Sequence, residues 1–236
     1  MCYTFGVRFD AYLFDVQGTL LDFYTPVSGA VLEYLSQMGR TDIDAGDFTR
    51  AWRKDYFRRV STLDQLSGVW QKVQRQYEAG FAAVAESYGM PPPDMATAER
   101  VAASWQRLVP WPDVRAGLAA IRDSALTATL SNTDMATVIG LAKRLDLRFD
   151  AYFTAELFCR FKPDPQVYLG ALDYLGTAPN RAALVASHPY DLDAAGSLGF
   201  GTVFVGRPAE YGDPARAHYA EAGRYTQVVT GIDQVE

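Results

Sequence analysis

A carboxylate stands at the point where an apolar run ends near the start of the chain. Tyr12, Leu13 and Phe14 precede Asp15, and Gly18 follows at a position where a sharp turn would use a glycine. The run predicts a buried strand, and open α/β sheets bind ligands beyond the carboxyl ends of their strands. Asp15 is therefore a candidate nucleophile. The same residues, taken alone, also fit a structural Asp that precedes a turn.

Two later segments carry further groups that hydrolytic enzymes use. Ser131 and Asn132 follow the apolar run that ends at Leu130, although a Ser-Asn pair there also fits the cap of a helix. Lys162 precedes Pro163, and a proline disfavours helical backbone in the residue before it. We therefore expect Lys162 in a loop, where its ammonium group can orient a carboxylate.

His188 is one of two histidines in the chain and stands before Pro189, which favours extended backbone. We expect it in the loop that follows a strand over 184–186, ahead of Asp191. A lone histidine is more often structural than catalytic, but its place between a strand end and a carboxylate favours a function. His218, in a polar tail, receives no role.

Four motifs, in this order along nearly the whole chain, resemble those of the haloacid dehalogenase (HAD) superfamily: Phe14-Asp15-x-x-Gly18-Thr19-Leu20, Leu130-Ser131-Asn132, Lys162-Pro163-Asp164-Pro165 and the segment 184–191. The resemblance is nearest to the 2-haloacid dehalogenase branch, and within it to relatives that have Ala-x-His before the last Asp, here Ala186-Ser187-His188. It implies a Rossmann-like α/β core, with a doubly wound and mostly parallel sheet, and an inserted helical cap.

The resemblance also implies roles for individual residues. Asp15 would be the nucleophile, Lys162 would pair with Asp191 and hold Asp15 ionised, and His188 with Asp191 would activate water. Substrate or halide binding would fall to Thr19, Arg53, Ser131, Asn132 and Tyr168.

Arg53 has this role only because Trp52-Arg53 matches a cap segment of the dehalogenases, and four further basic residues share its predicted helix. Arginine suits a leaving halide because its guanidinium is rigid and stays charged. Tyr168 fits a partly buried core aromatic equally well.

Gln17 separates this chain from the phosphatases of the superfamily. Those enzymes use a second Asp, two positions after the nucleophile, to protonate a departing alcohol. Gln17 cannot supply a proton, whereas a halide needs none, so the residue indicates carbon–halogen cleavage. Dehalogenases usually have tyrosine there, so the shape of the pocket wall around Gln17 does not follow from the resemblance. His188 likewise replaces an acidic oxygen that would bind Mg²⁺, so we expect no catalytic metal and no cofactor.

Helical periodicity fills the segment 23–104, which we interpret as the cap. Helices are expected from Pro26 to Gly39, over 47–60 and over 63–88, and a last one after the Pro91-Pro92-Pro93 break. Residues 1–22 and 105–236 form the predicted core domain, with helices over 114–122, 136–145 and 166–175 and strands over 126–130, 152–154, 183–186 and 202–205.

Composition limits the function classes. The 236 residues are 49% hydrophobic and 21% charged, as in ordinary globular proteins, and the net charge of -6 argues against nucleic-acid binding. An anionic small-molecule substrate would need local positive groups. Cys2 and Cys159 are too few for a disulfide framework, and we find neither a signal segment nor a membrane span. We expect a cytoplasmic protein without membrane partners, and the resemblance makes a homodimer plausible.

The interpretation is a hydrolase that acts on carbon–halide bonds and converts short 2-haloalkanoic acids to 2-hydroxy acids through an aspartyl ester at Asp15. Two alternatives stay open from sequence: a phosphatase of the same fold that acts on a small phosphorylated metabolite, and a catalytically silent binding protein. The preferred halogen, chain length and stereospecificity do not follow from the residues.

Overall fold

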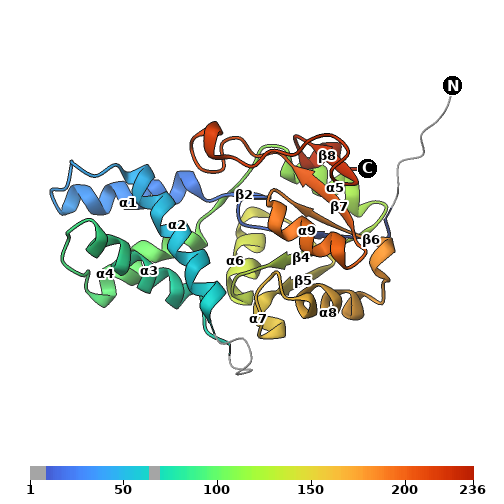
Figure 1. Ribbon diagram of the computed structural model, residues 1–236, viewed down its shortest axis with the longest axis horizontal. Helices are drawn as coiled ribbons and strands as arrows, with labels where there is room; N and C mark the ends of the chain where they lie inside the picture. The colour runs from blue at the N-terminus through green and yellow to red at the C-terminus, as the bar shows by residue number, and fades with distance from the viewer. Residues whose placement is uncertain (1–8, 64–69) are drawn as a thin grey trace.

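A parallel six-stranded sheet forms the centre of the larger lobe in the computed structural model, which describes residues 9–63 and 70–236 (Figure 1). Every neighbouring pair of its strands is parallel. The strand order is β5-β4-β1-β6-β7-β8, with bounds β1 Ala11–Phe14, β4 Leu126–Ser131, β5 Ala151–Thr154, β6 Ala182–Ala186, β7 Gly201–Val205 and β8 Gln227–Val229.

Helices cover both faces of the sheet, because each central strand is apolar on both sides. Tyr12 and Phe14 of β1 join the core cluster that contains Leu118 and Leu141 on one face, whereas Leu13 joins the cluster of the other face. The first face is covered by α5 (Val114–Arg122) and α6 (Met135–Leu145), and the second by α8 (Pro165–Leu175) and α9 (Pro189–Ser197) (Figure 1). A short helix, α7 (Ala155–Phe158), follows β5. This is the predicted doubly wound fold, and the prediction is confirmed.

The smaller lobe is helical and lies beyond one end of the sheet (Figure 1). Its helices are α1 (Tyr24–Gln37), α2 (Ala45–Thr62), α3 (Val73–Ser87) and α4 (Met95–Ala102), and a short 3₁₀ turn over Ala103–Gln106 follows. All four helices fall within the predicted cap of residues 23–104. That the cap and the core of residues 1–22 and 105–236 are separate domains stays a prediction, and residues 1–8 lie outside the described part.

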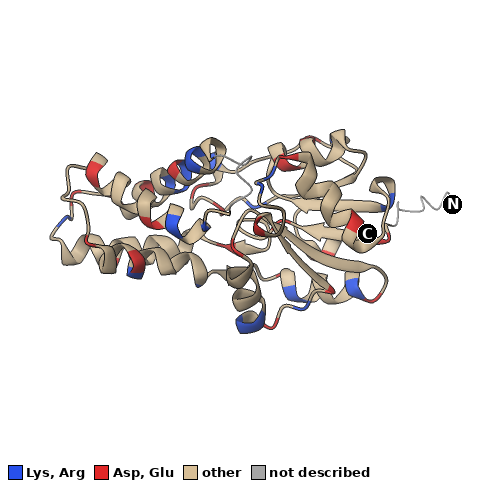
Figure 2. Ribbon diagram, turned by 90° about the horizontal axis from the view of Figure 1, so that it is seen from below, with Lys and Arg blue, Asp and Glu red and all other residues tan. Residues whose placement is uncertain are grey.

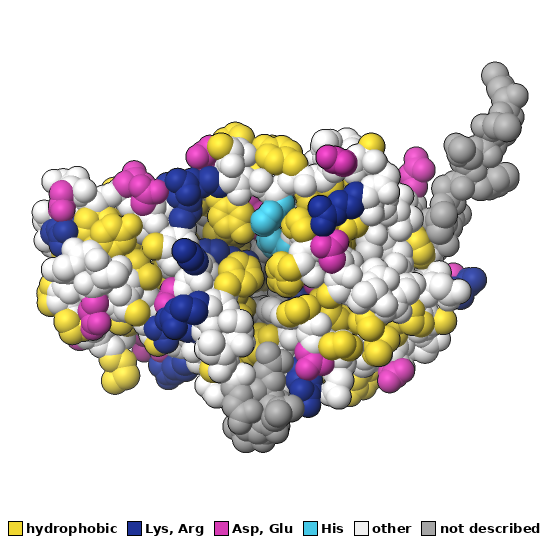
Figure 3. Space-filling view, in the orientation of Figure 1, with side chains coloured by type: hydrophobic (Ala, Val, Ile, Leu, Met, Phe, Trp, Pro, Cys, Tyr) yellow, Lys and Arg dark blue, Asp and Glu magenta, His cyan; other side chains and the backbone are white. Residues whose placement is uncertain are grey.

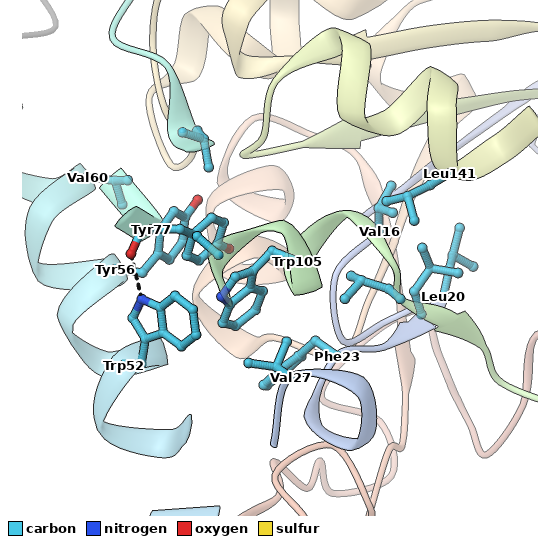
Figure 4. Packing of buried hydrophobic residues seen from close by; sticks show 14 of the residues in the cluster. Val16, Leu20, Phe23, Val27, Trp52, Tyr56, Val60, Tyr77, Trp105 and Leu141 are labelled. Carbon is cyan, nitrogen blue, oxygen red and sulfur yellow. Dashed lines mark hydrogen bonds between the residues drawn. The ribbon is translucent and has the colours of Figure 1, made fainter. Parts of the chain in front are cut away.

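Aromatic side chains fill the interior of the helical lobe (Figure 4). Trp105 stacks on Tyr77 with ring centroids 4.2 Å apart, and Trp52 meets Trp105 edge-on at 5.6 Å. The indole nitrogen of Trp52 donates to the backbone oxygen of Tyr77 at 2.9 Å. Stacked and edge-on pairs of this kind add about 0.5–1.5 kcal/mol each beyond the burial of their area. The helical lobe therefore has a densely packed aromatic core of its own.

One predicted helix begins later than the sequence indicates. The period suggests a helix over 63–88, but residues 70–72 are not helical and α3 starts at Val73; residues 64–69 lie outside the described part. The reason is a contact from the other lobe, because the carboxylate of Asp134 accepts the backbone N–H groups of Val73 and Gln74, each at 3.0 Å. A tertiary cap therefore sets the start of this helix.

The two links between the lobes pair as a short antiparallel ribbon, β2 (Leu21–Asp22) with β3 (Val109–Pro110). Each strand has only two residues, which is too short for an alternating apolar pattern to be recognised in the sequence. Among the described residues, no helix combines the length and the apolar character needed to cross a membrane.

Candidate active site

Three neighbouring strands deliver the candidate residues to one edge of the sheet. β4, β1 and β6 lie side by side, and Phe14 pairs with Thr129 on one side and with Val185 on the other. Asp15 follows β1, Ser131 is the last residue of β4, and His188 follows β6 by two positions. Since carboxyl ends of parallel strands meet at the same edge, the topology brings these loops together.

Both oxygens of the Asp15 carboxylate are held by side chains. Thr19 Oγ1 donates to Oδ2 at 2.7 Å, Lys162 Nζ lies 3.1 Å from Oδ1, and His188 Nδ1 lies 3.0 Å from Oδ2. Burial raises the pKa of Asp15, but the charge of Lys162 and the hydrogen bond from His188 outweigh this effect and lower the pKa well below its usual value. Asp15 is therefore an ionised carboxylate at neutral pH.

Lys162 is positioned by Asn132, whose side-chain amide pairs with its backbone. Lys162 N–H donates to Asn132 Oδ1 at 2.7 Å, and Asn132 Nδ2 donates to the Lys162 carbonyl at 3.0 Å. The Nζ group then contacts both Asp15 and Asp191, and Tyr168 donates its hydroxyl to Asp191 Oδ1 at 2.6 Å. Within residues 9–63 and 70–236, the second amide hydrogen of Asn132 has no acceptor and can serve a ligand, whereas Tyr168 supports Asp191 from the core side.

His188 bridges two carboxylates. Its Nδ1 contacts Asp15, and its Nε2 lies 2.7 Å from Glu210 Oε1. Burial lowers the pKa of His188, but the charge of Glu210 and the hydrogen bond to Asp15 outweigh this effect and raise the pKa to about 10. The ring is therefore an imidazolium at neutral pH, and it donates to both partners.

Gly18 makes room for this arrangement. Its φ of +94° is accessible to glycine without strain, and an added Cβ would lie 2.3 Å from Glu210 Oε1 and 3.2 Å from His188 Cε1. The turn after β1 also places Thr19, whose hydroxyl accepts the backbone N–H of Ser187 at 3.0 Å while it donates to Asp15. The first motif and the last motif are thus joined directly.

Arg53 enters the site region from the helical lobe. Its Nη1 lies 3.0 Å from Gln17 Oε1 and 3.0 Å from the Tyr77 hydroxyl, which itself donates to Gln17 Oε1 at 2.8 Å. The guanidinium carbon lies 4.6–5.4 Å from the centroids of four surrounding rings, those of Phe23, Tyr56, Phe57 and Trp105. Arg53 is buried, and among the described residues no carboxylate forms an ion pair with it.

A cavity of about 700 Å³ opens between the two lobes. Phe57 and Tyr190 contribute aromatic walls, and Lys54, Arg58 and Lys162 line it together with the charged ring of His188. Figure 3 shows a hollow between the lobes with basic and hydrophobic side chains at its margin and histidine atoms inside it. Elsewhere, acidic and basic residues are interspersed over both lobes (Figure 2). An anion is therefore attracted by the cavity and not by the overall charge.

The helical lobe is tied to the core directly beside the cavity. Tyr56 donates its hydroxyl to the backbone oxygen of Asn132 at 2.5 Å. On the neighbouring loop, Asp134 accepts from the indole of Trp70 at 2.8 Å as well as from the start of α3. Asn132 and the wall formed by α2 are therefore held in one geometry.

The structure gathers most of the predicted residues around one carboxylate. Thr19, Lys162 and His188 contact Asp15, and Asp191 joins them through Lys162. Asn132, Lys162 and His188 also line the cavity, whereas Arg53 lies behind its wall, against the cavity-lining Phe57. Ser131 is buried at the end of β4.

One predicted pairing is wrong. The sequence suggested that His188 acts with Asp191, but both ring nitrogens face other carboxylates, and Asp191 is engaged by Lys162 and Tyr168. The partner of His188 is Glu210, which sequence reasoning missed because the tail after Arg207 shows no clear pattern. Its position in the loop after β7, next to β6 in the sheet, was the available signal.

The arrangement suits attack by a carboxylate and a later proton transfer. An ionised, buried Asp15 can act as a nucleophile. A histidine that faces it can exchange protons with a water molecule next to the carboxyl carbon of Asp15. The Lys162 ammonium contacts both Asp15 and Asp191. Over the described ranges, no group of three or more His, Cys, Asp or Glu residues could hold a metal ion.

Comparison with known proteins gives consistent matches. A family model for haloacid dehalogenase-like hydrolases matches residues 9–199. The (S)-2-haloacid dehalogenase 4A of Burkholderia cepacia is 29% identical over 212 residues, which cover 85% of this chain and 86% of that protein. An L-2-haloacid dehalogenase of known crystal structure is 33% identical in sequence. Its structure aligns with a TM-score of 0.83 over 95% of this chain and 96% of that chain. A defluorinating L-2-haloacid dehalogenase is 31% identical with a TM-score of 0.85, covering 96% and 92%.

Proposed function

The chain belongs to the haloacid dehalogenase-like hydrolase family, and we propose that it is a hydrolase of carbon–halide bonds that converts short 2-haloalkanoic acids to 2-hydroxy acids. The observation that carries the proposal is the buried, ionised Asp15, held by Lys162 beside a cavity with cationic and aromatic walls. Gln17, where a phosphatase would need an acid, supports carbon–halogen cleavage over phosphate-ester hydrolysis.

In the first step, an oxygen of Asp15 attacks the carbon that bears the halogen. The new C–O bond forms as the C–halogen bond breaks, the halide leaves with the electron pair, and a chiral carbon is inverted. Lys162 and Thr19 orient the carboxylate. The aromatic wall of the cavity limits the access of water during this displacement.

Arg53 and Asn132 are the proposed donors to the departing halide. Arg53 brings a permanent charge with no carboxylate partner among the described residues, and Asn132 has one amide hydrogen to offer from the core side. Ser131 and the backbone N–H groups after β4 would hold the substrate carboxylate, and Lys54 and Arg58 would attract it into the cavity.

The second step needs a neutral His188. Formation of the ester removes the charge of Asp15, which is one cause of the raised pKa of His188, so the pKa falls and Nδ1 can lose its proton to solvent. Glu210 keeps the proton on Nε2 and leaves the Nδ1 lone pair directed at the ester. Water gives a proton to Nδ1 and attacks the carbonyl carbon of Asp15. The ester bond between that carbon and the substrate oxygen then breaks, and the second proton of the attacking water passes to the departing alkoxide. The Asp15 carboxylate is regenerated, His188 is protonated again, and the 2-hydroxy acid leaves.

The test is incubation of the pure protein with chloroacetate, followed by measurement of chloride and of glycolate in equal amounts. Asp15→Asn should release no halide, because an amide oxygen is a much weaker nucleophile than a carboxylate. Mass spectrometry must exclude deamidation of the variant. A protein that instead releases phosphate from a small phosphate ester in the presence of Mg²⁺, and leaves haloacids intact, would overturn the proposal.

We also propose that the enzyme acts in the cytoplasm and that it forms a homodimer, as the family resemblance implies. Support for the dimer is the set of apolar side chains exposed on the helices, among them Leu32 and Met95 of the helical lobe. Analytical ultracentrifugation of the pure chain decides this point, since a monomer at micromolar concentration would contradict it.

A further inference from the structure

Gln17 is the polar residue of the first motif whose side chain the proposed reaction leaves unused. It is buried, with 4% of its surface exposed. Its Oε1 accepts two hydrogen bonds, from Arg53 Nη1 and from the Tyr77 hydroxyl. Its Nε2 has no hydrogen-bond partner within the described ranges.

Arg53 determines which way the amide points. It has donors only, so an amide turned over would place Nε2–H against Nη1–H and would remove that hydrogen bond, whereas the Tyr77 hydroxyl can donate to Oε1 or accept from Nε2. Gln17 therefore presents its carbonyl oxygen to Arg53 Nη1, and its NH₂ group lies on the other side of the amide. Leaving a buried donor unpaired costs about 1–3 kcal/mol, which a ligand that accepts the hydrogen bond would recover.

Arg53 carries a second unpaired donor in the same cluster. Its Nε has no partner in the part of the chain that the structure describes, although Nη1 is engaged by Gln17 and Tyr77. In a guanidinium, Nε–H lies on the edge that binds anions in a bidentate way. Trp105 Nε1 is also unpaired, but it lies on the side of Trp52, whose ring Trp105 meets edge-on (Figure 4), so we do not count it as a donor to a ligand.

These unpaired groups are donors, and the groups around them are aromatic rings. Such a site suits a small anion that accepts hydrogen bonds from more than one direction. We propose that the NH₂ group of Gln17 donates to the departing halide together with Arg53 Nε, and that Arg53 Nη1 holds the amide of Gln17 in this orientation. Gln17 is thus a specificity residue of the halide subsite, an inference that rests on the proposed dehalogenase function.

A donor to the leaving group matters most for fluoride. Fluoride is the halide that accepts hydrogen bonds most strongly. It is also the halide that leaves carbon least readily when no hydrogen bond assists it. The Gln17 donor should therefore favour fluoroacetate relative to bromoacetate. A residue that only supported Arg53 would change the rates with both substrates by similar factors.

The binding experiment does not depend on turnover. Fluoride, chloride and bromide are titrated against the wild-type chain at constant ionic strength and followed by tryptophan fluorescence, to which Trp105 contributes from beside Arg53. Gln17→Leu should weaken halide binding about tenfold to hundredfold, which corresponds to one hydrogen bond to a charged group. Gln17→Met, which keeps the chain length without a donor, replaces it if the leucine variant does not fold.

Gln106→Leu is the matched control, because Gln106 is exposed and, among the described residues, its amide donates to the side chain of Gln74, 32 positions away in the sequence. Gln17→Glu keeps an acceptor for Arg53 and Tyr77 but has no N–H, so retention of halide affinity in this variant overturns the donor role. The kinetic readout is the ratio of kcat values for fluoroacetate and bromoacetate, which should fall at least threefold in Gln17→Leu and stay constant in Gln106→Leu.

A folded Gln17→Leu variant that binds halides less than tenfold more weakly than wild type overturns the proposal, as does a wild-type chain without saturable halide binding. If the wild type binds halide through Gln17 but hydrolyses no haloacid, the proposed function fails while the halide site stands. If the wild type hydrolyses haloacids and the kcat ratio does not change in Gln17→Leu, the function stands and the role of Gln17 fails.

Discussion

Glu210 Oε1 lies 2.7 Å from His188 Nε2, although the residues are 22 positions apart and lie in different loops. The loops follow β6 and β7, which are neighbours in the sheet, so the pair is a product of the topology. Because Nδ1 of the same ring faces Asp15, His188 is charged while Asp15 is a free carboxylate. The protonation state of the histidine therefore reports the state of the nucleophile.

The pKa values of the two histidines should be shifted in opposite directions from that of an ordinary imidazole. The pKa of His188 is raised to about 10 by Glu210 and Asp15 against the effect of burial, whereas burial and the charge of His188 lower the pKa of His218. Nitrogen NMR of labelled protein should show one ring that loses its proton below pH 6.5 and one that keeps it past pH 8. In Asp15→Asn the second ring should titrate at lower pH. Two rings that both titrate near pH 6.5 would contradict this account.

Glu210→Gln should slow hydrolysis of the ester more than its formation. Loss of the carboxylate lowers the pKa of His188, so the neutral ring forms at lower pH and the acidic limb of the hydrolysis rate moves to lower pH. The plateau should fall about tenfold to hundredfold, a part of the ~10²–10⁴ that a positioned base supplies. Glu221→Gln, an exposed change, is the control. An unchanged pH profile in Glu210→Gln would leave Glu210 a purely structural role.

His188→Ala should form the ester and keep it. Asp15, Lys162 and Arg53 are untouched, so chloroacetate should yield about one equivalent of chloride in a burst. Intact-mass analysis should then find an adduct that maps to the peptide containing Asp15. Steady turnover without an adduct would mean that another group activates the water, and absence of both burst and adduct would place His188 in substrate binding.

Chelators should leave dehalogenation unchanged. Lys162 stands between Asp15 and Asp191, and its ammonium neutralises the two carboxylates that a divalent ion would need. Chloride release from chloroacetate is measured before and after dialysis against EDTA, and again after Mg²⁺ is added. Loss of activity on dialysis with recovery on Mg²⁺ would contradict the assignment of Lys162 as the cation of the site.

The sequence predicted those elements whose apolar pattern is long enough to read. Runs such as Leu126 to Leu130 indicated buried strands, and the structure has β4 at Leu126–Ser131. The ribbon of β2 and β3 and the edge strand β8 were not predicted, because two or three residues cannot show a period. The start of α3 was also missed, since the side chain of Asp134, distant in the sequence, determines it.

The site was predictable to the extent that motifs contain it. Asp15, Lys162 and His188 stand in motifs at strand ends, and the structure brings them within hydrogen-bond distance. Glu210 stands in no motif, and its contact with His188 depends on the order of β6 and β7 and on the turn at Gly18. The orientation of the Gln17 amide likewise depends on how α2 and α3 pack, which no local pattern encodes.

The central claim is that the oxygen transferred to the substrate comes from Asp15. The most direct measurement is a single turnover of chloroacetate with enzyme in excess in H₂¹⁸O. Because water attacks the carbonyl carbon of the ester, the glycolate of this turnover should carry ¹⁶O in its new hydroxyl, and ¹⁸O should appear in the peptide that contains Asp15. Glycolate that carries ¹⁸O after one turnover, with an unlabelled Asp15 peptide, would show direct attack by water and would contradict the account.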